Sequence, residues 1–281
     1  MTSGTVSVQC CIAGGGPAGM MLGFLLARAG VEVLVLEKHA DFLRDFRGDT
    51  IHPSTLEVMH ELGLLDDFLK LPHQRVHQLS ARFGEHEAPL ADFSHLPVRC
   101  PFVVFIPQWD FLKFLAERVG EIRSWDDVKL LTVRVDRLRR WYRPGLLCIG
   151  DAAHAMSPVG GVGINLAIQD AVAAANVLAV PLRDGMLATR HLARVQRRRE
   201  LPTRVTQRLQ IVMQRRVIAR VLESRGAPLR LPLALRLFAR YPVLRRIPAR
   251  LIGIGVRPEH VQSPSVPAAS RGADALSGGG G

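Results

Sequence analysis

One stretch near the start of the chain constrains the fold more than any other. An apolar run over residues 6–13 leads directly into Gly-Gly-Gly-Pro-Ala-Gly at residues 14–19. This order predicts a strand, a tight turn and a helix. Gly14 can adopt the backbone angles of the turn, Gly16 lets a pyrophosphate approach the backbone, and Gly19 lets the helix lie close to the strand. The N-terminus of the helix then directs unpaired N–H groups and a positive dipole end at the phosphates.

The sequence around this motif is what a dinucleotide-binding fold requires. We expect the first helix over residues 17–29 and a buried second strand over residues 31–37, which ends in Glu37. Glu37 follows Gly19 by 18 residues, close to the place of the acid that binds ribose hydroxyls in such folds. The motif predicts a dinucleotide site but does not distinguish NAD from FAD.

Composition narrows the class of protein. The formal net charge of the 281 residues is +12, and much of the excess is arginine after Arg183. We interpret this arginine as a solvated helical surface, with a weak membrane-surface contact through basic C-terminal helices as the alternative. A nucleic-acid partner is not predicted, because the chain has no nucleic-acid-binding motif. The oligomeric state is not predicted.

The four cysteines show no metal-ligand spacing, so no metal site is predicted. We expect reduced, buried thiols, including Cys10 and Cys11 in the first strand, and a cytoplasmic protein. The sequence contains no run of 18 apolar residues, so no membrane span is predicted.

The middle of the chain alternates between helical and strand patterns. A helix is expected from Pro53, with Ser54 and Glu57 as a capping box. Further elements are predicted as short strands within 74–106, a helix at 108–119, a strand at 128–135 and a short buried strand at 146–149.

A second informative stretch runs from Gly150 into an Ala-rich helix. Asp151 would offer a carboxylate to polyol hydroxyls at the end of a strand. The loop over residues 158–163 has few side chains, so its backbone can lie against a flat ring. The helix starting near Ile164 would direct its positive end at that ring, which favours negative charge on a reduced flavin.

These stretches resemble the FAD-dependent aromatic hydroxylases, the p-hydroxybenzoate hydroxylase-type flavoprotein monooxygenases. The resemblance covers residues 14–37, Arg47-Gly48 with the helix after them, Pro107-Gln108, and residues 150–171. The last match is the most specific and favours FAD over NAD. The resemblance implies cofactor contacts at Gly14, Gly16, Pro17, Ala18, Gly19, Glu37, Lys38, Arg47, Gln108, Asp151, Pro158, Gly163, Ile164 and Asn165.

The roles of these residues follow from the resemblance. The glycines would hold the pyrophosphate, Glu37 the adenosine ribose, and Arg47 the phosphate region. Gln108 and Asp151 would hold the ribityl and pyrophosphate part, while Gly163 and Asn165 would lie beside the isoalloxazine ring.

No catalytic residue is predicted. His154 is interpreted as a structural loop histidine, and His52 has no partner in the sequence that would make it an acid or base.

The chain departs from the resemblance after Gly120, where the family places further strands, an Asp-Gly segment and most of a substrate-domain sheet. Our hypothesis is an internal deletion that joins near Gly120-Glu121. The predicted fold is α/β: a Rossmann-like FAD/NAD(P)-binding domain with a reduced substrate-domain β-sheet and a helical C-terminal segment. Its parts are expected at 1–72 with 143–182 (FAD-binding), 73–142 (substrate-domain remnant with linking helix), 183–260 (basic helical segment) and 261–281 (disordered tail).

The expected function is an FAD-dependent monooxygenase that uses NAD(P)H and O₂ to hydroxylate an aromatic or polycyclic small molecule. The alternative is a catalytically degenerate FAD-binding protein or an uncoupled NAD(P)H oxidase, because loss of the middle segment would expose the reaction site to water. A third interpretation, an NAD-dependent dehydrogenase, is disfavoured by the loop over residues 150–165.

Overall fold

A parallel sheet and the helix that connects its first two strands form the N-terminal unit. The computed structural model describes residues 7–37, 49–83, 86–119, 123–124, 136–156, 159–213, 237–238 and 240–266. In the described residues the sheet has the order β1-β2-β8 with parallel pairing. Its elements are β1 (Cys10–Ala13), α1 (Pro17–Arg28), β2 (Val33–Glu37) and β8 (Arg123–Ser124). The strand–turn–helix–strand prediction is therefore confirmed.

Two glycines explain the geometry of the first turn. Gly14 has φ of 111°, a backbone conformation that side chains other than glycine's rarely adopt. A Cβ on Gly19 would lie 1.9 Å from the carbonyl oxygen of Gly14, so only glycine lets α1 approach the turn this closely. Pro17 occupies the first turn of the helix, where its missing N–H costs nothing.

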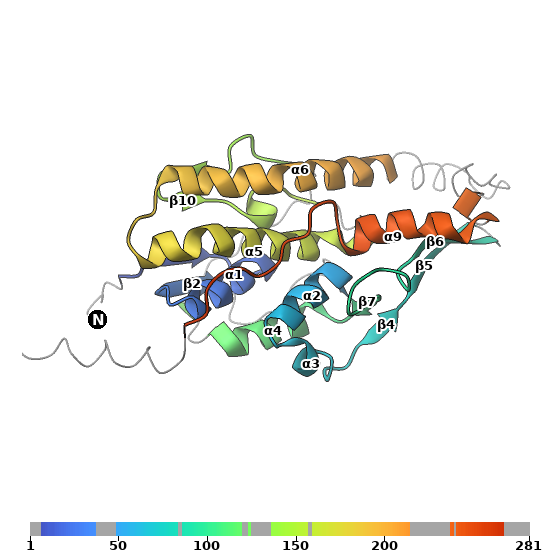
Figure 1. The fold of residues 1–281 in the computed structure, drawn as a ribbon, viewed down its shortest axis with the longest axis horizontal. Helices are drawn as coiled ribbons and strands as arrows, with labels where there is room; N and C mark the ends of the chain where they lie inside the picture. The colour runs from blue at the N-terminus through green and yellow to red at the C-terminus, as the bar shows by residue number, and fades with distance from the viewer. Residues whose placement is uncertain are drawn as a thin grey trace, which may run out of the picture.

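Helices form the layers around this unit (Figure 1). The helix α5 (Val162–Arg183) packs on α1, α4 (Gln108–Val119) packs on another side of α1, and α6 (Thr189–Met213) runs beside α5. The apolar faces of α1, α4 and α5 meet in one core. By length and composition α5 could cross a membrane, yet 72% of its apolar window is buried inside the molecule, as in a core helix.

Small antiparallel sheets complete the structure, and two of their residues, Ile51 and Val104, belong to the same core. The sheet β3-β7-β4 and the hairpin β5-β6 follow one another in the middle of the chain, and β9 and β10 form a second hairpin. The helix α9 packs on β6. The bounds of these elements are β3 (Thr50–Ile51), α2 (Pro53–Glu61), α3 (Leu65–Phe68), β4 (Gln74–Val76), β5 (Gln78–Phe83), β6 (His86–Asp92), β7 (Val103–Phe105), β9 (Tyr142–Arg143), β10 (Leu146–Leu147) and α9 (Arg246–Gly253), with 3₁₀ turns η1 (Gly150–Ala152), η2 (Val159–Gly161) and η4 (Pro242–Arg245).

Two local predictions are wrong. The predicted capping box at α2 is absent, because His52 is the N-cap residue without a side-chain cap and Glu57 instead accepts a hydrogen bond from the Arg99 N–H. The short buried strand expected over residues 146–149 is only β10, which pairs antiparallel with β9, and Leu146 is 55% exposed.

The cysteines and arginines also differ from the composition-based prediction. Cys11 is exposed rather than buried. Burial raises the pKa of the Cys10 thiol to about 11, with a smaller contribution from neighbouring Cys11. Among the arginines expected on a solvated surface, Arg199 is 1% exposed.

The C-terminal residues 261–266, which the sequence assigned to a tail, lie along the body of the molecule. The Val266 N–H donates to the carbonyl oxygen of Arg28 in α1, and Ser263 is buried. Residues 267–281, the strand predicted at 128–135 and the junction at Gly120-Glu121 lie outside the described residues.

The Gly14–Gly19 contact predicts the effect of Gly19→Ala. The added methyl group would overlap the Gly14 carbonyl, so we expect a loss of about 1–3 kcal/mol in the free energy of unfolding. Urea denaturation measures this loss. The matched control is Gly163→Ala in α5, where the nearest atom would be 3.9 Å away; equal losses in the two variants would contradict the prediction.

Candidate cofactor site

Two glycine-bearing loops that are far apart in the sequence meet at Gly150. A Cβ on Gly150 would lie 3.0 Å from the Cβ of Ala18 in α1 and 3.4 Å from the Cβ of Ala167 in α5. The first turn of α1, the loop before α5 and the second turn of α5 are therefore in van der Waals proximity. This is the juxtaposition that the sequence predicted for one dinucleotide held between the two loops.

Both helices present uncapped N-termini to this region. Neither Gly16, the N-cap of α1, nor Gly161, the N-cap of α5, has a side-chain cap, and neither first turn contains an acidic residue. No carboxylate in the first turn of either helix therefore neutralises the positive end of its dipole. Such helix ends bind phosphate and other anions through backbone N–H groups.

Glu37 closes the first loop from the side of the sheet. Its side chain is 4% exposed, and its Oε2 accepts a hydrogen bond of 2.7 Å from the Gly15 N–H. The carboxylate at the end of β2 therefore lies directly against the glycine-rich turn. A second carboxylate, Asp151, is exposed in η1 beside Gly150.

Asn165 ties the start of α5 to β3 and α2. Its Oδ1 accepts hydrogen bonds from the His52 N–H (2.7 Å) and the Thr55 hydroxyl (2.8 Å), and its Nδ2 donates to the carbonyl oxygens of Thr50 and Gly161 (3.1 Å each). Both polar atoms of the Asn165 amide are therefore engaged within the protein.

Gln108 is connected to the same region through two consecutive residues, Asp49 and Thr50. The Gln108 N–H donates to Asp49 Oδ1 at 3.4 Å, and Asp49 precedes Thr50, whose hydroxyl donates to the Gly161 carbonyl at 3.2 Å. The N-terminus of α4 is thus connected to the loop before α5.

A buried carboxylate holds the loop that follows residue 149 in place. Asp170 is fully buried in α5 and accepts hydrogen bonds from the Gly150 N–H (3.1 Å), His154 Nε2 (2.5 Å) and Arg199 Nε (2.8 Å). Burial alone would raise the pKa of Asp170, but His154 and Arg199 together lower it. The ionised carboxylate therefore fixes both the position of Gly150 and the orientation of its backbone.

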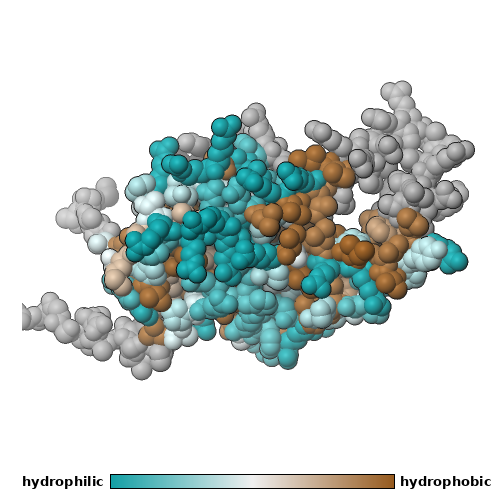
Figure 2. All heavy atoms as spheres, turned by 45° about the horizontal axis from the view of Figure 1, so that its top comes forward, coloured by the Kyte–Doolittle hydropathy of each residue, from teal (hydrophilic) through white to brown (hydrophobic). Residues whose placement is uncertain are grey.

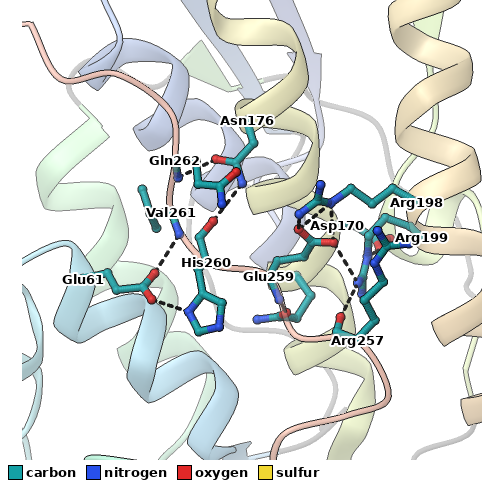
Figure 3. A network of polar contacts seen from close by, with 11 residues as sticks. Glu61, Asp170, Asn176, Arg198, Arg199, Arg257, Glu259, His260, Val261 and Gln262 are labelled. Carbon is teal, nitrogen blue, oxygen red and sulfur yellow. Dashed lines mark hydrogen bonds and ion pairs between the residues drawn. The ribbon is translucent and has the colours of Figure 1, made fainter.

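The same network extends to the C-terminal segment (Figure 3). Arg199 lies 3.6 Å from Glu259, and Arg198 binds Glu259 at 2.7 Å. Farther along the segment, Glu61 accepts hydrogen bonds from His260 Nδ1 and from the Val261 N–H at 2.7 Å. Residues 257–266 are therefore attached to α1, α2, α5 and α6.

Neither buried histidine has the surroundings of a catalytic base. His52 Nδ1 donates to the Ile252 carbonyl at 2.9 Å, and burial lowers the pKa of His52 to about 4 against the opposing effect of hydrogen bonds to Ile252 and Gly160. His154 is bound to Asp170 and packs against Trp141, with ring centroids 5.0 Å apart. Both residues serve the structure in these contacts.

The structure thus brings most of the predicted cofactor residues to one region. Gly14 to Gly19, Glu37, Gln108, Asp151 and Gly163 to Asn165 lie on elements joined by the contacts above. Lys38, Arg47 and Pro158 lie outside the described residues. Across the residues that the structure describes, no group of three or more His, Cys, Asp or Glu could hold a metal ion.

Sequence reasoning missed the charged residues that support the site. Asp170 carries a signal, because it is a charge within an otherwise apolar, Ala-rich helix. Nothing in the sequence singles out Arg199 as buried, because it is one of three consecutive arginines. Glu259 lies in a segment without periodicity.

Comparisons with known proteins agree with this geometry. The family model described as "FAD binding domain" matches residues 7–122 and 120–209. The chain is 42% identical over 109 residues to 6-methylpretetramide 4-monooxygenase of Streptomyces rimosus, covering 39% of this chain and 25% of that protein. It is 35% identical over 111 residues to a rifampicin monooxygenase of Rhodococcus hoagii, covering 40% of this chain and 22% of that protein. These matches span about a quarter of each relative's length.

Solved structures share the fold. The anhydrotetracycline hydroxylase OxyS from Streptomyces rimosus superposes with a TM-score of 0.66 at 20% identity, covering 88% of this chain and 76% of that one. The probable FAD-dependent monooxygenase pqsL from Pseudomonas aeruginosa superposes with a TM-score of 0.63 at 16% identity, covering 77% of this chain and 99% of that one. The α/β FAD-binding fold of this chain is therefore confirmed.

Removing the charge of Asp170 tests the buried network. In Asp170→Asn the buried Arg199 guanidinium loses the nearer of its two carboxylate partners, so we expect a loss of about 3–5 kcal/mol in the free energy of unfolding, measured by urea denaturation. The control is Glu200→Gln on α6, which removes the solvent-accessible ion pair with Arg204 and costs less than about 1 kcal/mol. A similar small loss for both variants would contradict the assigned role.

His52 predicts a pH dependence of stability. Its pKa is about 4 in the folded protein and 6.5 in its ordinary state, so the unfolded chain binds more protons between these values. Stability should therefore fall as pH falls from 6.5 to 4, by up to about 3 kcal/mol from this residue. Urea midpoints across this range measure the slope, and His52→Gln should flatten it. An unchanged slope in the variant would refute the assignment.

Proposed function

Because the chain belongs to the FAD binding domain family, we propose that it binds FAD between its two glycine-bearing loops and acts as an FAD-dependent monooxygenase. The observation that carries the proposal is the meeting of these loops at Gly150, between Ala18 and Ala167. The expected partners are NAD(P)H, O₂ and an aromatic or polycyclic small molecule, in a cytoplasmic protein.

The residues present fit the cofactor. A Cβ on Gly14 would meet nothing within 4 Å, and one on Gly163 would meet only Met156 at 3.9 Å. Protein packing therefore leaves space at both glycines, one for the pyrophosphate and one for the isoalloxazine ring. Glu37 would bind the adenosine ribose, and Gln108 and Asp151 the ribityl and pyrophosphate part.

The cofactor would supply the redox chemistry when bound, accepting electrons from NAD(P)H and passing them to O₂. The protein chain would supply the contacts that bind the cofactor and the electrostatic potential around it. The α1 N-terminus offers N–H groups and positive potential to the phosphates, and the α5 N-terminus does the same for negative charge on the ring. Asp170 is a positioning residue, because its carboxylate accepts a hydrogen bond from the Gly150 N–H and so holds that loop in place.

The proposal also includes a class of substrate and an internal deletion of the chain. Relatives are named for tetracycline-type and rifampicin substrates, which supports a polycyclic aromatic class. The two stretches matched by the family model meet at residues 120–122, which supports a deletion near Gly120-Glu121. The strands β4 and β7 and the hairpin β5-β6 would then be the reduced substrate domain, and β3 pairs with β7 from the FAD-binding part.

One observation favours the second candidate, an FAD-binding protein that is catalytically degenerate or an uncoupled NAD(P)H oxidase. Along β1 the exposure alternates, and Cys11 and Ala13 are exposed. Parallel sheets are normally covered on both faces. An uncovered sheet suggests a site less able to exclude water, which would divert reduced cofactor to hydrogen peroxide.

A titration of FAD tests the cofactor proposal. We expect saturable quenching of flavin fluorescence by the purified chain, and a loss of about tenfold or more in affinity for Gly14→Ala. The matched control is Gly63→Ala, because Gly63 also has positive φ (70°) and also has no atom within 4 Å of its Cβ position, but lies after α2. Absence of binding, or equal losses in both variants, would overturn the proposal.

Oxygen and NADPH consumption then separate the two candidates. A monooxygenase yields hydroxylated product in proportion to NADPH oxidised with an aromatic substrate. Hydrogen peroxide in the same proportion identifies the uncoupled oxidase, and bound FAD without oxidation of either NADH or NADPH identifies the degenerate protein.

A further inference from the structure

Apolar side chains that face solvent gather over the C-terminal half of α6 and over α9 (Figure 2). At η4 and α9, Val243 and Ile247 are each 65% exposed. On α6, Leu209 and Val212 are exposed as well. Single exposed apolar residues are common on soluble proteins, but a gathered set indicates a contact surface.

A groove joins these residues into one strip. Ile247 and Leu251 are four residues apart, so they share one face of α9. Leu251 lines a groove that Leu209 of α6 and the exposed Val256 also line. The strip therefore runs from η4 over α9 to the end of α6. We call it the apolar strip, and its residues are Val243, Ile247, Leu251, Val256, Leu209 and Val212.

The opposite face of α9 fixes the direction in which the apolar strip points. Ala249 belongs to a buried cluster with Phe93 and Leu96. A Cβ on Gly253 would lie 2.9 Å from Leu96 and 3.1 Å from Phe93, so small residues let α9 lie close to β6 and the loop after it. Turning Ile247 inward would break this packing, and its side chain therefore stays at the surface.

Arginines flank the apolar strip. Residues 224–258 contain arginine but no Asp, Glu or Lys. Arg208 on α6 and Arg246 and Arg250 on α9 are exposed. Among the residues that the structure describes, none of these three arginines forms an ion pair with a carboxylate. Their charges are therefore available to an anionic partner.

The positive charge of the protein is concentrated in the same part of the chain. Residues 183–258 hold 19 arginines and 3 acidic residues, which gives a net charge of +16. Residues 1–182 hold 17 basic and 20 acidic side chains, which gives −3. Such an uneven distribution attracts an anionic partner to one part of the molecule.

The chemistry of this surface selects among partners. A second copy of the chain that met it across a twofold axis would place arginines against arginines. A single-stranded nucleic acid is bound through aromatic stacking, whereas the apolar strip is aliphatic. An anionic lipid bilayer offers phosphate groups to the guanidinium groups and an apolar interior to the aliphatic side chains.

We propose that the apolar strip and its arginines dock the protein on the surface of an anionic lipid bilayer. Val243 and Ile247 enter the boundary between headgroups and acyl chains, while Arg246 and Arg250 bind lipid phosphates. The contact is peripheral and does not involve α5, whose apolar window is mostly buried. The proposal goes beyond the proposed function, because the residues that make this contact are not among the cofactor residues.

Co-sedimentation of the full chain with vesicles tests the proposal. The vesicles are pure phosphatidylcholine, or phosphatidylcholine mixed with phosphatidylglycerol. We expect about tenfold or more tighter binding to the mixed vesicles, because each arginine near the surface is attracted to anionic lipid. Raising the salt concentration should weaken this binding, because salt screens exposed charges. FAD is left out, so a chain that fails to bind FAD can still confirm the docking surface.

One variant tests the apolar contribution. Ile247→Ser removes an exposed aliphatic side chain and should weaken binding to the mixed vesicles about fivefold or more. The matched control is Met186→Ser, because Met186 is 64% exposed but lies between α5 and α6, away from the apolar strip. Both side chains are exposed, so we expect the urea midpoints of both variants to equal that of the wild type.

A second pair of variants tests the charges. The double variant Arg246→Gln/Arg250→Gln should weaken binding to the mixed vesicles about tenfold or more. The matched control is Arg190→Gln/Arg194→Gln, because these arginines are also exposed and four residues apart but lie in the first turns of α6.

The proposal is overturned if the chain does not sediment with the mixed vesicles or binds both kinds of vesicle equally. It is also overturned if the variants at Ile247 and at Arg246 and Arg250 bind as their controls do. Equal affinity for soluble polyglutamate and for the mixed vesicles would overturn it in favour of an acidic protein partner.

Discussion

The ionised carboxylate of Asp170 is the interaction on which the rest of the structure depends. A buried carboxylate is strongly unfavourable unless charged and hydrogen-bonding partners surround it. Here the partners come from the loop at Gly150 and His154 and from Arg199 on α6. Satisfying one charge therefore determines where three separate segments lie. One of them is the loop that lies between the first turn of α1 and the second turn of α5.

The network is balanced in charge. The two carboxylates of Asp170 and Glu259 face the two guanidinium groups of Arg198 and Arg199. Buried ion pairs contribute little net stability, but removing one member leaves the other uncompensated. We therefore infer that the network mainly specifies arrangement. It fixes the C-terminal segment on α6, and Glu61 and Asn176 continue that attachment along α2 and α5.

Local sequence rules predicted the parts of the fold that depend on backbone geometry. The positive φ of Gly14, the close approach at Gly19 and the helix ends followed from residue types and spacing. Rules failed where tertiary contacts compete with local ones: Glu57 binds Arg99 rather than capping α2, and Leu146 lies in an exposed hairpin. The partnership of Arg199 could not be predicted, because nothing in an arginine run indicates which member turns inward.

The polar contacts that hold the two glycine-bearing loops come from described segments that are far apart in the sequence. Among the described residues, the partners of the Asp170 and Asn165 side chains lie at residues 50–55, 150–165 and 199. At the sheet, by contrast, Cys11 and Ala13 of β1 are exposed. The contacts that bring the loops together and the cover of the sheet are therefore separate features of this fold, because they involve different residues.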